Sequence, residues 1–130
     1  MVKNARDNFY YSVGGRIQFG ETAEQAVKRE VREELGIELE IERLGFIHEA
    51  YFYDLVGDAK GRLIYEPAFY FYMQVPDDFR FQNKPFLEDG TPQYLEWLPF
   101  DTQETIYPVF FKTELQNPTR EIRHIVQDER

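Results

Sequence analysis

One stretch of the sequence, residues 15–37, constrains this chain more than any other. It reads GRIQFGETAEQAVKREVREELGI and follows the spacing G-x5-E-x7-R-E-U-x-E-E-x-G-U, in which U is an apolar residue. A chance match at every fixed position is on the order of 10⁻⁹ per starting point when each residue type is taken at about 7%. The spacing is therefore a specific signature, and the chemistry of the chain is expected to depend on it.

A helix is predicted inside this stretch, from about residue 23 to residue 35. Thr22 is a favourable N-cap, and Gln25 three residues later completes a capping box. Gly36 suits the left-handed position at which many helices end. At about 100° per residue, the apolar residues fall on one broad arc of the helix. They are Ala23, Ala26, Val27, Val31 and Leu35.

Three glutamates make this helix unusual. Glu30 and Glu34 project from the middle of the apolar arc, and Glu33 lies at its margin near Arg29. A carboxylate on a buried face is strongly disfavoured unless it is paired or binds a metal, and carboxylates at these spacings repel one another. A solvated acidic face, the common alternative, is excluded because polar residues already occupy the opposite side. Clustered hard oxygen ligands suit Mg²⁺ or Mn²⁺, so the glutamates are predicted to bind a divalent metal.

The spacing of residues 15–37 is that of the Nudix box, and the chain therefore resembles the Nudix hydrolases. The resemblance implies an α/β fold, the Nudix-type α/β/α sandwich with a mixed β-sheet, formed by a single domain over residues 1–130. It implies Mg²⁺-dependent cleavage of a diphosphate bond in a small-molecule substrate, a nucleoside diphosphate linked to another moiety; Mn²⁺ is the alternative cofactor. The alternative function is a non-catalytic Nudix-fold module that binds a nucleotide or a protein.

The resemblance also implies which residues act in the reaction. Glu30, Glu33 and Glu34 would bind the metal, and the backbone carbonyl of Gly15 would join them. The base that activates the attacking water is left open. The candidates are Glu33, Glu30 and Glu88, in that order.

Glu21 and Arg29 are expected to act on geometry rather than on the substrate. In the family, the residues at these two positions pair with each other and brace the loop against the helix. Partners outside the metal shell orient the groups that bind the metal. We therefore expect both residues to have a positioning role.

The rest of the chain is predicted to be mostly strand. The expected strands cover residues 9–13, 38–53, 63–75, 93–98 and part of the tail at 120–130. The second and third of these would form a long hairpin, with a bulge near Gly45 where the apolar alternation changes phase. A second helix is expected over residues 101–115, interrupted at Pro108.

A long loop is expected over residues 76–92, and loops of this length are often functional. Some Nudix proteins draw an extra acidic ligand or base from the loop before the strand that carries a tryptophan, which here is Trp97. Glu88 is the best match in this loop, and Asp89 is the second. A solvated loop acid is the equally weighted alternative.

Composition limits the partners of the chain. The net charge of −9 argues against binding of long nucleic acid through its backbone. The absence of cysteine excludes a thiolate metal site. No apolar run is long enough to span a bilayer, and the first residues do not resemble a signal peptide. A cytoplasmic protein that acts on a small molecule is therefore expected.

The expected fold is shortened at its N-terminus. Nudix domains usually have another strand or hairpin before the strand expected here at residues 9–13, so this strand would lack a neighbour. An exposed, aromatic-rich edge invites pairing with another chain. A homodimer that covers the gap is therefore expected for the chain as given, and a natural chain that begins upstream of Met1 is the alternative.

Overall fold

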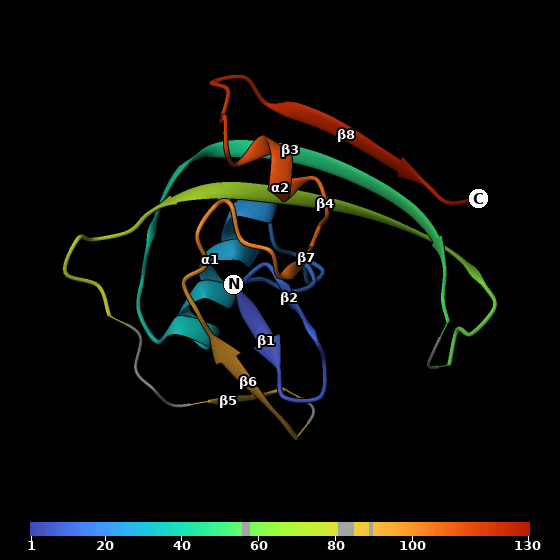
Figure 1. The fold of residues 1–130 in the computed structure, drawn as a ribbon, viewed down its shortest axis with the longest axis horizontal. Coiled ribbons are helices and arrows are strands. Elements are labelled where there is room, and N and C mark those ends of the chain that lie inside the picture. The colour runs from blue at the N-terminus through green and yellow to red at the C-terminus, as the bar shows by residue number, and fades with distance from the viewer. Residues whose placement is uncertain (56–57, 81–84, 89) are drawn as a thin grey trace. The chain divides into compact units, whose positions relative to one another are not determined.

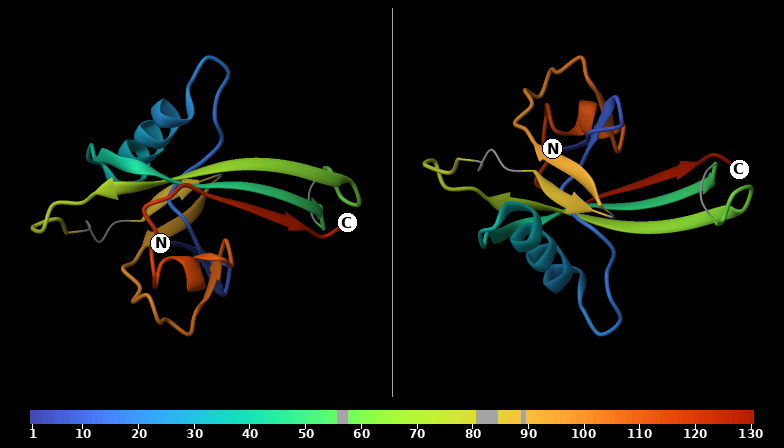
Figure 2. Two further views of the ribbon diagram at one scale, coloured as in Figure 1. Left: turned by 90° about the horizontal axis from the view of Figure 1, so that it is seen from above. Right: turned by 90° about the horizontal axis from the view of Figure 1, so that it is seen from below.

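A computed structural model describes residues 1–55, 58–80, 85–88 and 90–130 of the chain. The chain divides into two compact units, one made of Met1–Glu40 and Gln74–Thr119 and the other of Ile41–Met73 and Arg120–Arg130. The first unit contains a five-stranded sheet and the second a three-stranded sheet. Their elements are drawn in Figure 1 and from two further directions in Figure 2.

The sheet of the first unit has the strand order β5-β6-β1-β2-β7. Its strands are β1 (Val2–Asn4), β2 (Phe9–Tyr11), β5 (Phe86–Glu88), β6 (Thr91–Leu95) and β7 (Thr105–Tyr107). β1 is antiparallel to both β2 and β6, and β5 is antiparallel to β6. β7 is parallel to β2, so the sheet is mixed.

The strand predicted near residues 9–13 is present as β2, but it has a neighbour on each side. Val2 of β1 lies opposite Tyr11, and Thr105 of β7 lies opposite Phe9. The expectation that this strand lacks a neighbour is therefore wrong. The segment before it looked polar as a whole, yet a three-residue strand needs only one core side chain, and Val2 is fully buried. The predicted homodimer thus loses the observation on which it was based.

The helix α1 (Ala23–Leu35) has the predicted bounds and the predicted caps. The Gln25 N–H donates to the Thr22 hydroxyl oxygen at 3.2 Å, and the Thr22 N–H donates to the Gln25 side-chain oxygen at 2.9 Å. Gly36 ends the helix with φ of 74°. The buried residues of α1 are Ala26 and Val31. Within the part of the chain that the structure describes, no helix is long and apolar enough to cross a membrane.

Two other segments of the first unit differ from their predictions. The loop expected over residues 76–92 contains β5 and the start of β6, which form a hairpin with Gly90 in the turn at φ of 75°. The helix expected over residues 101–115 is reduced to the single turn α2 (Phe111–Glu114), and β7 occupies residues before Pro108. β-branched and aromatic residues favour such a strand, and its one buried side chain is that of Ile106.

The sheet of the second unit has the order β4-β3-β8. Its strands are β3 (Glu40–Tyr53), β4 (Leu63–Gln74) and β8 (Arg123–Asp128). β3 and β4 form the predicted hairpin, in which the Asp54 N–H donates to the Arg62 carbonyl at 3.0 Å, and the two arrows run in opposite directions in Figure 1. β8 is the predicted strand of the tail and lies parallel to β3. Gly45 and its neighbour Phe46 are both buried, so the burial of β3 changes phase where the sequence indicated, while the bulge itself stays a prediction.

One carboxylate on β3 connects the three strands of this sheet. Glu49 accepts a hydrogen bond from the Tyr65 hydroxyl of β4 at 2.7 Å and lies 2.6 Å from His124 Nε2 of β8. The Arg130 guanidinium, just past β8, lies 3.8 Å from the centre of the Tyr51 ring. The tail strand is therefore held by side chains as well as by its backbone.

Candidate metal-binding active site

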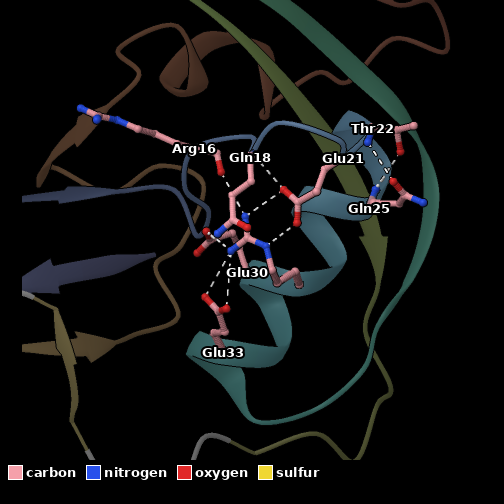
Figure 3. A network of polar contacts seen from close by, with 8 residues as sticks. Arg16, Gln18, Glu21, Thr22, Gln25, Glu30 and Glu33 are labelled. Atoms are coloured by element: carbon pink, nitrogen blue, oxygen red, sulfur yellow. Dashed lines mark hydrogen bonds and ion pairs between the residues drawn. The ribbon is translucent and has the colours of Figure 1, made fainter.

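Arg29 connects the loop before α1 to the helix itself through hydrogen bonds to Glu21 and to the Arg16 carbonyl, two residues labelled in Figure 3. Its Nε donates to Glu21 Oε1 at 2.6 Å and its Nη2 donates to Glu21 Oε2 at 3.1 Å, which is the two-bond geometry of a strong guanidinium–carboxylate pair. The same Nη2 donates to the Arg16 carbonyl at 3.0 Å. The two side chains are only 21% and 18% exposed. The structure thus pairs the two residues that were expected to brace the loop.

The ion pair between Glu21 and Arg29 stabilises the charged form of each residue. The Arg29 guanidinium, followed by the Gln18 N–H, holds the pKa of Glu21 below its usual value. Glu21 and then Glu30 raise the pKa of Arg29, because both carboxylates accept hydrogen bonds from the charged guanidinium. Both members therefore remain ionised over the whole physiological pH range.

Glu30 lies between this pair and the glycine turn that precedes the loop. Arg29 Nη1 donates to Glu30 Oε1 at 2.7 Å, and the Glu30 side chain is only 15% exposed. On its other side the carboxyl group lies against the backbone of Gly15. A methyl group placed on Gly15 would lie 2.5 Å from the carboxyl carbon, which is far inside a van der Waals contact. Position 15 must therefore be glycine if Glu30 is to keep this place.

The other two glutamates of the predicted cluster occupy different surroundings. Glu34 Oε2 accepts a hydrogen bond from the Gly14 N–H at 3.2 Å, so Glu30 and Glu34, one helical turn apart, both reach the same pair of glycines. Glu33 is 58% exposed, and its carboxylate lies 3.4 Å from Arg29 Nη1. Among the residues the structure describes, no three acidic or histidine side chains converge closely enough to form a ready-made metal site.

The residues present fit a hard divalent cation by their chemistry. Mg²⁺ and Mn²⁺ take oxygen ligands, and carboxylates at the Gly14–Gly15 turn are ligands of that kind. Because Gly15 has no side chain, the Glu30 carboxylate can lie directly against the backbone there. The role of the Gly15 carbonyl as a further ligand stays a prediction.

Glu88, the third candidate for the base, is the last residue of β5, and its backbone lies opposite Thr91 of β6. The placement of its side chain is outside what the structure describes, and Asp89 is outside the described residues altogether. The role of either acid stays a prediction.

The sequence did not reveal two polar pairs that hold β2, the strand that leads into the glycine turn. The Tyr11 hydroxyl donates to the Gln93 side-chain oxygen, and Gln93 is 1% exposed. The Tyr10 hydroxyl donates to Glu96 Oε2 at 2.7 Å, which, together with burial, raises the pKa of Tyr10 to about 12. The partners in each pair are more than 80 residues apart in the chain. Only the strand order, with β1 between β2 and β6, brings them together.

Comparison with known families agrees with this geometry. The family model of the NUDIX domain matches residues 1–118. The chain therefore belongs to the Nudix family, whose members are in general hydrolases that act on pyrophosphate bonds of small nucleotide derivatives and use divalent metals. The predicted fold class is confirmed, since a mixed α/β structure with two mixed sheets is consistent with the Nudix α/β/α sandwich. No curated protein matched the chain.

Proposed function

We propose that this protein is a Mg²⁺-dependent pyrophosphohydrolase that cleaves the diphosphate bond of a nucleoside diphosphate linked to another moiety. One observation carries the proposal. In a chain of the Nudix family, two glutamates of α1 lie at the glycine turn, with the Glu30 carboxyl group against Gly15 and Glu34 bonded to the Gly14 N–H.

The chain's own residues would bind the cation and fix its ligands. Glu30, Glu33 and Glu34 supply carboxylate oxygens, and the Gly15 carbonyl is the further ligand we propose. When bound, Mg²⁺ or Mn²⁺ neutralises phosphate charge and lowers the pKa of a water molecule. Phosphoryl transfer depends mainly on positioning and charge neutralisation. The chain therefore needs to supply metal ligands and the residues that position them, and it needs no protein nucleophile.

The exposures of the glutamates favour Glu33 as the base. Its side chain is 58% exposed, so an attacking water reaches it, whereas the Glu30 side chain is 15% exposed and accepts the shorter of the Arg29 hydrogen bonds, at 2.7 Å against 3.4 Å for Glu33. Glu30 is therefore the second candidate and Glu88 the third. A base must lie within hydrogen-bond reach of the water from which it takes a proton.

The alternative is a Nudix domain that binds a nucleotide without cleaving it. One observation favours this alternative: in the described part of the chain, three carboxylates do not already surround a common point. Phosphate release separates the two functions, because a binding module holds the nucleotide and leaves it intact.

A phosphate-release screen tests the proposal. ADP-sugars, dinucleoside polyphosphates, nucleoside triphosphates and capped RNA ends are offered with Mg²⁺ and with Mn²⁺, and EDTA is expected to abolish turnover until excess Mg²⁺ is added. Glu33→Gln is expected to lower turnover by at least about 100-fold, since both proton transfer and charge stabilisation suffer. Circular dichroism should show an unchanged fold.

Glu24→Gln is the matched control. Glu24 is an exposed acid in the first turn of the same helix and occupies a variable position of the signature. Turnover of this variant is expected to equal that of the wild type. A Glu33→Gln variant as active as the Glu24→Gln variant would refute the proposed function.

A further inference from the structure

Phe19 is exposed to solvent in the loop that leads into α1. Its relative exposure is 109%, the highest among the exposed large apolar side chains of the described residues. A single exposed apolar side chain on a protein surface needs no explanation by itself. Phe19 differs from such residues in how its backbone is held.

A hydrogen-bonded turn places Phe19 at a corner of the chain. The Glu21 N–H donates to the Gln18 carbonyl at 3.0 Å, so Phe19 and Gly20 are the two central residues of a four-residue turn. Gly20 has φ of 94°, in the range that the second central position of a type II turn requires. The first central residue of such a turn points away from the chain, which accounts for the full exposure of the ring.

The ion pair that braces the candidate site also fixes this turn (Figure 3). The Gln18 N–H donates to Glu21 Oε2 at 2.9 Å, and the same carboxylate accepts two hydrogen bonds from Arg29. Arg29 in turn donates to Glu30 at 2.7 Å and to the Arg16 carbonyl at 3.0 Å. The Arg29 guanidinium therefore holds both the turn that contains Phe19, through Glu21, and the carboxylate of Glu30.

We infer that Phe19 is a substrate-binding residue that stacks on the planar base of the nucleoside diphosphate substrate. The inference rests on the proposed function and adds to it the residue that recognises the base. Carboxylates and a cation account for recognition of phosphate, but they do not bind the planar face of a base. Every base presents a π-face that an aromatic ring binds. Because the backbone of the turn is already fixed by hydrogen bonds, only the side chain of Phe19 loses conformational freedom on binding.

Equilibrium binding measurements distinguish the contribution of the base to affinity from that of the phosphates. The affinities of ADP and of methylenediphosphonate, which has two phosphonates and no base, are measured by titration calorimetry in the presence of Mg²⁺. Phe19→Ala is expected to weaken ADP binding by about 5- to 150-fold, the range reported for removing one aromatic stacking partner of a base. Binding of methylenediphosphonate is expected to be unchanged. Phe19→Trp should bind ADP at least as tightly as the wild type, and Phe19→Leu should resemble Phe19→Ala.

Phe100→Ala is the matched control, because Phe100 is also an exposed phenylalanine of the first unit, at 68%. It should bind both ligands like the wild type. ADP binding by Phe19→Ala at wild-type affinity would overturn the inference while leaving the proposed function intact. An equal loss for both ligands would also overturn it, because the effect would then be on the phosphate site. If the wild type binds neither ligand, the inference fails, and the phosphate-release screen decides the proposed function separately.

Discussion

Gly15→Ala tests whether the position of Glu30 matters for activity independently of folding. The added methyl group would lie 2.5 Å from the Glu30 carboxyl carbon and 2.8 Å from Oε2. Both atoms are at the end of a flexible side chain, so the carboxyl group is expected to swing aside while the backbone stays in place. The perturbation is therefore confined to one side chain of the candidate site.

The expected change in stability is small because two effects oppose each other. Gly15 does not have a positive φ, so alanine fits the backbone and reduces the entropy of the unfolded chain, which stabilises by about 0.4–1 kcal/mol. The displaced Glu30 loses its 2.7 Å hydrogen bond from Arg29, which offsets this gain. The free energy of unfolding should therefore change by less than about 1 kcal/mol, or about 4 °C in melting temperature.

The expected change in turnover is large. A displacement of about 1 Å at a catalytic group costs about 100-fold in rate, so kcat with Mg²⁺ should fall by about that factor. The assay combines kcat on a substrate identified by the phosphate-release screen with thermal melts in EDTA and in Mg²⁺. The rise in melting temperature on adding Mg²⁺ should shrink in the variant.

Gly36→Ala is the control, and it is expected to lower stability without lowering turnover. Gly36 has φ of 74° with open space around its Cα, so alanine there is strained without touching another group. It is expected to lose about 1–2 kcal/mol of stability and to keep its turnover per folded molecule. Wild-type kcat in Gly15→Ala would refute the reasoning, because the approach of Glu30 to Gly15 would then have no part in catalysis.

Two further predictions concern single carboxylates. Glu34→Gln should melt in EDTA at or above the wild-type temperature, since it removes one repelling charge while an amide oxygen still accepts the Gly14 N–H; a clear fall measured by calorimetry would show that the charge is structural. Glu49→Gln should remove an acid-sensitive part of the stability. Hydrogen bonds from Tyr65 and then from His124 lower the pKa of Glu49 below its usual 4.5, so its contribution is present above that value and is lost as the pH falls through the lowered pKa. Melting temperatures of wild type and variant should therefore converge as the pH falls below about 4.5, and a difference that stays constant as the pH is lowered would contradict the assignment.

Local signals in the sequence predicted the helix of the site well. The caps at Thr22 and Gly36 depend on residues within one turn of the helix ends, and the bounds of α1 agree with them. The placement of the glutamates on that helix follows from its period of 3.6 residues. The bounds and caps of α1 could therefore be predicted from neighbouring residues alone.

Features that depend on distant partners were not predicted. β1 is three residues long, and its Val2 is buried only because β2 and β6 lie on both sides of it. The bond from Tyr10 to Glu96 joins strands that no local pattern relates. The expected second helix failed for the same reason, since the strand that replaced its first half exists by pairing with β2. Short strands owe their conformation to neighbours rather than to propensity.

The tail strand β8 bears on the order in which the protein folds. Phe46 pairs with Arg123, which follows it by 77 positions, and the matched Nudix region ends before this strand begins. Parallel contacts over such separations form slowly, because a long loop must close first. During synthesis β3 and β4 emerge together as a hairpin, but the other edge of β3 has no partner until the tail leaves the ribosome. During synthesis the edge of β3 that pairs with β8 is therefore expected to stay open until residues 123–128 have emerged, and this aromatic-rich edge is where a chaperone or a misfolding contact would meet the chain.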